Sequence, residues 1–179
     1  HHHPGGEPAF VAAMNETAAR LSMAGARFVD PAGLSPANVA SARDVLALLR
    51  AAWAHEEIRA YTGTAQFTAR FRAPRYTLGY GNTNPLVASS RYDVALSKTG
   101  YLDEAGRCLA TVVTIDGVPT AMVLLDSFGS RSHLGDVGRI RRWLTTGDGG
   151  PVARPAAEYA ATRNAAREAR TASPISSAE

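Results

Sequence analysis

Residues 94–101 read Val94-Ala95-Leu96-Ser97-Lys98-Thr99-Gly100-Tyr101, an apolar, strand-like run that passes into the tripeptide Lys-Thr-Gly. Lys98 is the only lysine of this 179-residue chain, which carries eighteen arginines. A lysine presents a compact ammonium group on a flexible stem, whereas an arginine presents a planar fork, so the two are not interchangeable at a binding site. Lys98 is therefore the first candidate for a functional residue.

The sequence around Lys98-Thr99-Gly100 makes this tripeptide a more specific signal of function. On its own, such a short motif is more often a surface turn than a site. Further motifs stand on both sides of it: Met14-Asn15, Phe28-Val29-Asp30-Pro31-Ala32-Gly33-Leu34-Ser35, Ser41-Ala42-Arg43-Asp44, Tyr80-Gly81-Asn82-Thr83-Asn84-Pro85-Leu86-Val87 and Tyr101-Leu102-Asp103-Glu104-Ala105-Gly106-Arg107-Cys108-Leu109. Together, from about Pro4 to Leu144, they resemble the D-alanyl-D-alanine carboxypeptidase/endopeptidase family of low-molecular-mass penicillin-binding proteins, in which Lys-Thr-Gly is a signature.

The resemblance implies a fold class. We expect an α+β domain of the β-lactamase/transpeptidase type, with a mostly antiparallel sheet flanked by helices on both faces and incomplete at its N-terminal side. The residues themselves point the same way, because 108–115 would be apolar on both faces of a strand. A strand of that kind has to be covered on both sides.

The resemblance also implies a substrate-binding strand. In the family, the lysine and threonine hold the terminal carboxylate of a peptide and the glycine leaves room for it; the matching residues are Lys98, Thr99 and Gly100. By analogy, the backbone N–H of Tyr101 would complete an oxyanion hole. A cation and a hydroxyl form charge-assisted hydrogen bonds to a carboxylate, which makes this assignment physically sound. The implied activity is serine-type hydrolysis of peptidoglycan peptides that end in D-Ala, and it needs no cofactor.

The catalytic pair of that family is missing from the sequence. Its serine nucleophile lies in S-x-x-K, where a lysine one helical turn later accepts the proton. Because Lys98 is the only lysine, the serine would have to occupy position 95, where Ala95 stands; no serine begins an S-x-N motif either. We expect both segments upstream of His1. This chain alone should then be inactive, and β-lactam antibiotics would react only with a protein that includes the nucleophile segment.

Two other functions stay open. A catalytically silent relative would use the same strand to bind the peptidoglycan of the cell wall, and upstream sequence without S-x-x-K and S-x-N would favour it. The other alternative is an unrelated basic α/β module that binds an anionic partner. The formal net charge of +3 is the observation behind it. Nucleic acid does not fit as that partner, because only Arg139, Arg141 and Arg142 cluster and no aromatic residues alternate with basic ones.

Composition is that of a globular protein. Apolar residues make up 45% of the chain, and no uninterrupted apolar run reaches the ~18 residues of a membrane-spanning helix. The sequence begins without Met or a signal segment, so we expect an export signal in a preceding part and a periplasmic or other extracytoplasmic location. Cys108 is the only cysteine, which excludes an internal disulfide, and the sequence indicates no metal site.

Local patterns predict the elements around these motifs. We expect helices at 8–22, 42–54 and 134–144, a half-buried strand at 65–72 with a return strand at 75–80, and a hairpin of strands 108–115 and 118–125 around Asp116-Gly117. Ser41 and Asp44 form a capping-box pattern ahead of the second helix. Residues 1–147 would be the C-terminal portion of the peptidase domain. Residues 148–179 would be an Ala/Arg/Ser-rich, largely disordered tail with a transient helix near 156–170.

Overall fold

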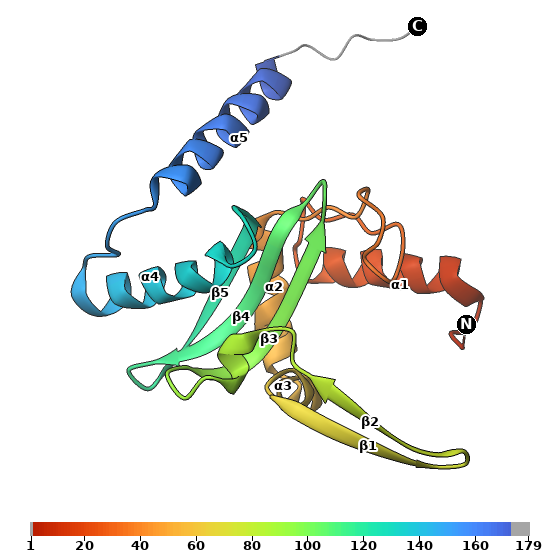
Figure 1. Ribbon diagram of the computed structural model, residues 1–179. Coiled ribbons are helices and arrows are strands. Elements are labelled where there is room, and N and C mark those ends of the chain that lie inside the picture. Colours follow the sequence, from red (N-terminus) through yellow and green to blue (C-terminus); the bar gives the residue numbers. More distant parts are fainter. Residues whose placement is uncertain (1, 173–179) are drawn as a thin grey trace, which may run out of the picture. The chain divides into compact units, whose positions relative to one another are not determined.

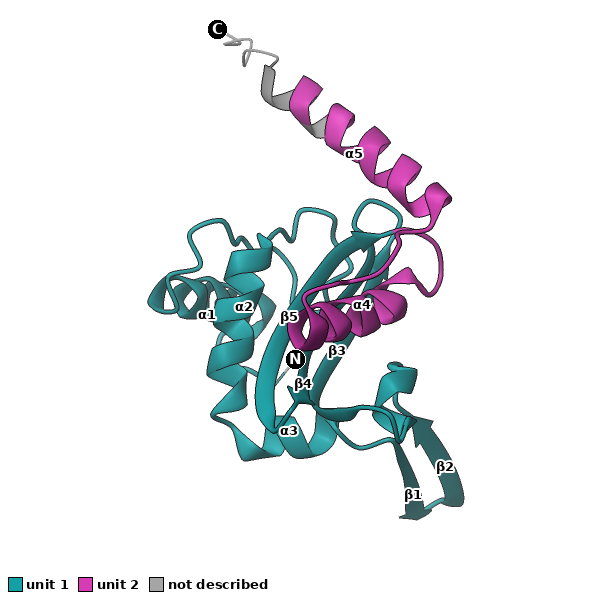
Figure 2. Cartoon of the chain, turned by 90° about the vertical axis from the view of Figure 1, so that its left-hand side faces the viewer, with its two compact units in different colours: residues 1–127 teal, residues 128–179 magenta. Residues whose placement is uncertain are grey.

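Three strands, β3 (Asp93–Leu102), β4 (Gly106–Ile115) and β5 (Val118–Ser127), form an antiparallel sheet with β4 in the middle (Figure 1). The computed structural model describes residues 2–172 of the chain. The chain divides into two units, and the sheet belongs to the first of them, His1–Ser127 (Figure 2). Among the described residues, β3 is thus one of the two edge strands of the sheet and pairs with β4 alone.

The turn between β4 and β5 follows the sequence prediction. Asp116 and Gly117 have positive φ angles of 49° and 79°. A two-residue turn of this kind matches the right-handed twist of the strands that it joins. The hairpin predicted at 108–115 and 118–125 is confirmed, and each strand is two residues longer at the end away from the turn.

The core of the first unit lies between the sheet and α2 (Ala42–Trp53). Leu49 of α2 packs against Leu96 of β3 and Val112 of β4, and these three side chains are only 3–4% exposed. On the other face of β4, Leu109 is fully buried. The middle strand is therefore buried on both faces, as its apolar residues predicted. The α+β fold class with antiparallel sheets is confirmed.

Helix α2 begins with the predicted capping box. The Ser41 hydroxyl accepts a hydrogen bond from the Asp44 N–H at 3.2 Å, and the Asp44 carboxylate accepts one from the Ser41 N–H at 2.8 Å. The carboxylate also accepts hydrogen bonds from the Ser41 hydroxyl at 2.7 Å and from the Gly25 N–H at 3.4 Å. These bonds, that from the Ser41 hydroxyl first, hold the pKa of Asp44 below its ordinary value.

The lowered pKa of Asp44 predicts a pH-dependent stability. Because this pKa is lower in the folded than in the unfolded chain, the stabilising contribution is complete above the unfolded value of about 3.9 and is lost as the pH falls toward the folded value. We expect Asp44→Asn to flatten the acid side of the stability profile, and Ser41→Ala to change it in the same direction. Urea unfolding at a series of acidic pH values measures this; profiles parallel to the wild type would contradict it.

Helix α1 (Gly6–Arg20) lies about two residues earlier than the predicted range of 8–22. Pro8 falls inside the first turn and does not start the helix, which a proline tolerates because its missing N–H has no helical partner there. The side chain of Asn15 ties α1 to the following loop. It accepts from the Phe28 N–H at 2.9 Å and donates to the Phe28 carbonyl at 2.8 Å.

Strands β1 (Gln66–Arg72) and β2 (Arg75–Gly81) form a separate two-stranded antiparallel sheet (Figure 1). They lie where the sequence predicted, but the prediction that the first strand is half-buried is wrong: Phe67 is 62% exposed and Tyr80 opposite it is 51% exposed. Alternation reveals which side chains share a face, but not whether anything covers that face. Here the hairpin extends away from the other elements of its unit (Figures 1 and 2).

The second unit, Phe128–Glu179, begins with α4 (Ser132–Thr146), which includes the predicted helix at 134–144. Gly147 ends this helix as expected. Its φ angle is 77°, a left-handed conformation that glycine adopts readily, and its N–H donates to the Trp143 carbonyl at 2.8 Å.

The remainder of this unit contains α5 (Arg154–Ala172), over the interval where a transient helix was expected. Most of its described side chains are exposed, and Tyr159 lies 5.4 Å from Phe128, measured between ring centres. The disorder expected after this helix falls on residues 173–179, which lie outside the described residues. The domain boundary after residue 147 stays a prediction.

Removal of residues 149–179 should leave the melting temperature nearly unchanged, because a mostly exposed terminal segment contributes little to a core. Scanning fluorimetry of the truncated and intact proteins measures this. As a control, Leu109→Ala removes a fully buried side chain of β4 and should lower the melting temperature clearly. A large decrease for the truncation would show that the tail packs against the rest of the protein.

Candidate functional site

Lys98 lies on β3, at the edge of the three-stranded sheet. It stands opposite Ala110 of β4, and residues opposite each other in an antiparallel pair share a face. Ala110 packs against the core cluster that includes Leu49 of α2, so Lys98 projects from the same face of the sheet. Its side chain is exposed, and its ammonium group contacts the carbonyl oxygen of Thr99. The cation is therefore accessible to a ligand that approaches the sheet edge.

Ser97 and Thr99 project from the opposite face of β3, because successive residues of a strand alternate. The buried Ser97 hydroxyl accepts a hydrogen bond from the side-chain amide of Asn84 at 2.8 Å. The Thr99 hydroxyl lies 2.7 Å from the hydroxyl of Thr83. Both neighbours of Lys98 are thus held by side chains of one short segment, residues 82–84.

Asn84 was missed at the level of the sequence, which predicted only a loop here. Its side chain is fully buried, and its amide oxygen accepts a hydrogen bond from the Leu86 N–H at 3.0 Å. This bond caps η1 (Pro85–Ala88), a short 3₁₀ helix. Asparagine directly before proline is a helix-start signal, so the cap was detectable. The contact with Ser97 was not, since it joins residues 13 positions apart.

Asn82 connects the same segment to α3 (Glu56–Thr62), a short helix that the sequence did not predict. Its side-chain amide donates to the carbonyl oxygens of Thr62 at 2.9 Å and Thr64 at 3.0 Å. Its amide oxygen accepts from the Asn84 N–H at 3.0 Å. The carbonyls at the end of a helix lack helical partners, and Asn82 satisfies one of them here. The segment 82–84 is thereby fixed both to α3 and to β3.

Gly100 and Tyr101 follow Lys98 and Thr99 on β3. A β-carbon added to Gly100 would come no closer than 4.0 Å to Cys108 on the neighbouring strand, so the chain itself leaves space beside this glycine. The Tyr101 hydroxyl donates to the Asp103 carboxylate at 2.6 Å, and the Arg107 guanidinium lies 4.5 Å from the centre of the Tyr101 ring. These contacts orient the Tyr101 side chain; the role of its backbone N–H stays a prediction.

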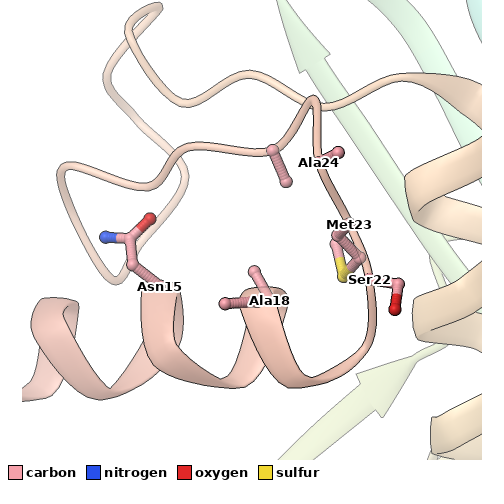
Figure 3. A pocket seen from close by; sticks show the side chains of 7 residues that line it. Asn15, Ala18, Ser22, Met23 and Ala24 are labelled. Carbon is pink, nitrogen blue, oxygen red and sulfur yellow. The ribbon is translucent and has the colours of Figure 1, made fainter.

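Two hollows of about 380 Å³ each lie beside α1. The first is bordered by side chains of α1 and of the loop after it, including Ala18, Ser22 and Met23 (Figure 3). The second is bordered by residues that include Phe10. Neither hollow is lined by a residue of 97–101, so both lie apart from the candidate strand.

Other kinds of site were sought in the described part of the chain. Within residues 2–172, no group of three or more His, Cys, Asp or Glu side chains is placed to hold a metal ion. None of the helices in the same range is both long and apolar enough to cross a membrane. The candidate site therefore consists of the Lys98 ammonium and the Thr99 hydroxyl on edge strand β3. A cation and a hydroxyl on neighbouring residues are suited to binding a carboxylate.

Known proteins resemble this chain over most of its length. The profile of the D-alanyl-D-alanine carboxypeptidase family, peptidase S11, matches residues 1–129. The D-alanyl-D-alanine endopeptidase of Pseudomonas aeruginosa is 42% identical over 176 residues, which cover 98% of this chain and 56% of that protein. The protein of the same name from Escherichia coli is 42% identical over 159 residues, or 89% of this chain and 51% of that protein.

Solved structures share the fold. A variant of a Streptomyces DD-transpeptidase gives a TM-score of 0.68 at 25% identity, over 75% of this chain and 52% of that one. A D-alanyl-D-alanine carboxypeptidase from Mycobacterium tuberculosis gives 0.62 at 21% identity, over 72% and 48%. The chain spans about half the length of the curated relatives it matches. The matched profile and the identity over nearly the whole chain show that this chain belongs to the D-alanyl-D-alanine carboxypeptidase family, as its motifs predicted.

Proposed function

We propose that the chain is the C-terminal portion of a serine-type D-Ala-D-Ala carboxypeptidase/endopeptidase that acts on the stem peptides or cross-links of peptidoglycan. The observation that carries the proposal is the accessible Lys98-Thr99-Gly100 on an edge strand, in a chain of this family. The names of the relatives from Pseudomonas aeruginosa and Escherichia coli support endopeptidase action. The protein would work outside the cytoplasm, where peptidoglycan lies.

In this proposal, β3 recognises the carboxyl end of the peptide. The Lys98 ammonium and the Thr99 hydroxyl hold the terminal carboxylate, with hydrogen bonds to a charged group contributing about 1.5–3 kcal/mol each. The space beside Gly100 admits the peptide backbone. An extended peptide is also able to pair with an edge strand through backbone hydrogen bonds, as in other strand-addition complexes.

Hydrolysis needs a nucleophilic serine in an S-x-x-K motif, and these 179 residues contain no such motif. That serine would attack the carbonyl carbon of the penultimate D-Ala and form an ester, while the C–N bond breaks and the leaving amine takes a proton; water would then hydrolyse the ester. The Tyr101 N–H, with the N–H of the serine itself, would stabilise the negative oxygen that forms during each attack. This chain would supply substrate recognition and part of the oxyanion site, and no turnover by itself.

Covalent labelling with a fluorescent penicillin tests the proposal, because only a nucleophilic serine retains the label. The 179-residue chain should remain unlabelled. The full-length gene product should be labelled, and replacement of the serine of its S-x-x-K should abolish the label. A full-length product that contains neither S-x-x-K nor label would overturn the proposal.

The second candidate function is peptidoglycan binding without cleavage, for which the accessible Lys98-Thr99-Gly100 strand edge would also serve. A catalytically silent relative would use Lys98 and Thr99 to bind peptidoglycan without cleaving it. Sedimentation with purified peptidoglycan distinguishes the two functions when it is combined with the penicillin label. Binding without label in the full-length product would favour the silent relative.

A further inference from the structure

The asparagine segment, residues 82–84, stands out because it buries a polar side chain behind the candidate strand. Asn84 is 0% exposed, and both ends of its amide are used: the nitrogen donates to the Ser97 hydroxyl and the oxygen accepts from the Leu86 N–H. A buried amide that lost either partner would leave a polar group without a hydrogen bond, which costs about 1–3 kcal/mol. The arrangement therefore favours one position of β3 relative to residues 84–86.

The geometry of the strand connects this contact to Lys98. Ser97 and Thr99 flank Lys98 and point to the other face of β3, where they bind Asn84 and Thr83. Two contacts on alternate residues resist rotation of the strand about its own axis. Because side chains alternate, the same restraint sets the direction in which the Lys98 side chain leaves the strand. Asn82 binds the segment to the end of α3, so residues 82–84 are held in place independently of β3.

We propose that Asn84 is a positioning residue for carboxylate recognition. It acts through Ser97 to fix β3, so that the Lys98 ammonium and the Thr99 hydroxyl, which leave the strand on opposite faces, reach one carboxylate at the strand edge together. The proposal rests on the proposed function of that strand. Thr83 adds to the effect, because its hydroxyl contact limits the directions in which the Thr99 hydroxyl points.

The test compares two substrates in the full-length protein: a peptide that ends in D-Ala-D-Ala, and the same peptide with its terminal carboxylate converted to an amide. A displacement of about 1 Å in a positioned group lowers rates by up to about 100-fold. Asn84→Ala should therefore lower kcat/KM for the free carboxylate by about 10- to 100-fold, with an effect of less than about 3-fold for the amide. The preference of the enzyme for the carboxylate would fall correspondingly.

Ser97→Ala removes the same hydrogen bond by deleting its acceptor on β3. It should also lower the preference of the enzyme for the carboxylate substrate over the amide. Because the two changes break one contact, the double variant should lose less than the product of the single effects. This variant also keeps the test usable if Asn84→Ala does not fold. Asn15→Ala is the matched control, since the Asn15 side chain hydrogen-bonds to the backbone of Val11 and Phe28 and not to β3. It should lower both activities equally or not at all.

Equal losses for both substrates in Asn84→Ala would show a purely structural role and overturn the inference.

Hydrogen exchange supplies a readout that needs no activity. In Asn84→Ala, the amides of residues 96–101 should exchange at least about tenfold faster, while those of β5 keep the wild-type rate. Unchanged exchange in β3 would overturn the inference. If β3 exchanges faster in Asn84→Ala, but the wild-type protein neither reacts with penicillin nor cleaves the peptide, the proposed function would be wrong and the restraint on the strand would stand.

Discussion

Lys98→Arg in the full-length protein is expected to lower kcat/KM for peptides that end in D-Ala-D-Ala by about 10- to 100-fold, although the charge is retained. The guanidinium group is larger than an ammonium group and favours a planar, two-point approach to a carboxylate. It would therefore hold the peptide end at a different distance from β3, and displace the Thr99 hydroxyl from the same carboxylate. Steady-state hydrolysis of a D-Ala-D-Ala peptide measures the effect.

The control for this variant is Arg50→Lys, a swap between the same two residue types at an exposed position of α2. It should leave turnover and stability within the experimental error, because surface substitutions away from packed or bonded features change stability by less than about 0.5 kcal/mol. Wild-type kcat/KM in Lys98→Arg would remove Lys98 from the proposed site and, with it, the carboxylate-binding role of β3.

Leu109→Ala is expected to lower the free energy of unfolding by about 2–5 kcal/mol, the range found for leucines removed from packed cores. Leu109 is fully buried in the middle strand of the sheet, where the lost side chain leaves a cavity that the neighbouring backbone cannot close. Urea or guanidinium unfolding of the longest form that folds reversibly measures the change.

Leu34→Ala is the matched control, because the same side chain is removed from a position that is 73% exposed. The expected change is below about 0.5 kcal/mol. A similar loss in both leucine variants would mean that the sheet interior is not the main source of stability in this protein.

The elements that could be predicted are those whose signals are local. Ser41 and Asp44 stand at capping-box spacing, and α2 begins there. Asp116-Gly117 supplies the backbone angles of a two-residue turn, and Gly147 ends α4. In each case the deciding interaction joins residues within four positions of each other, so the sequence contains all of it. The family assignment also came from local motifs, read in their order along the chain.

The elements that were missed depend on distant partners. The short α3 has seven residues, too few for a clear apolar period. Nothing in the alternation of β1 indicates that its apolar face stays exposed. In the candidate site, Lys98 was found because it is the only lysine. Asn84 was not, because its importance comes from burial and from Ser97, which only folding brings beside it.

The single lysine has a practical consequence for labelling. An activated ester reacts with amines, and arginine guanidinium groups stay protonated and unreactive toward it. In this 179-residue chain, Lys98 is therefore the one side-chain amine that such a reagent encounters, alongside the α-amino group. Since Lys98 is exposed on β3, a fluorophore coupled through it would report from the strand edge itself, and any ligand seated there would shield the amine from modification.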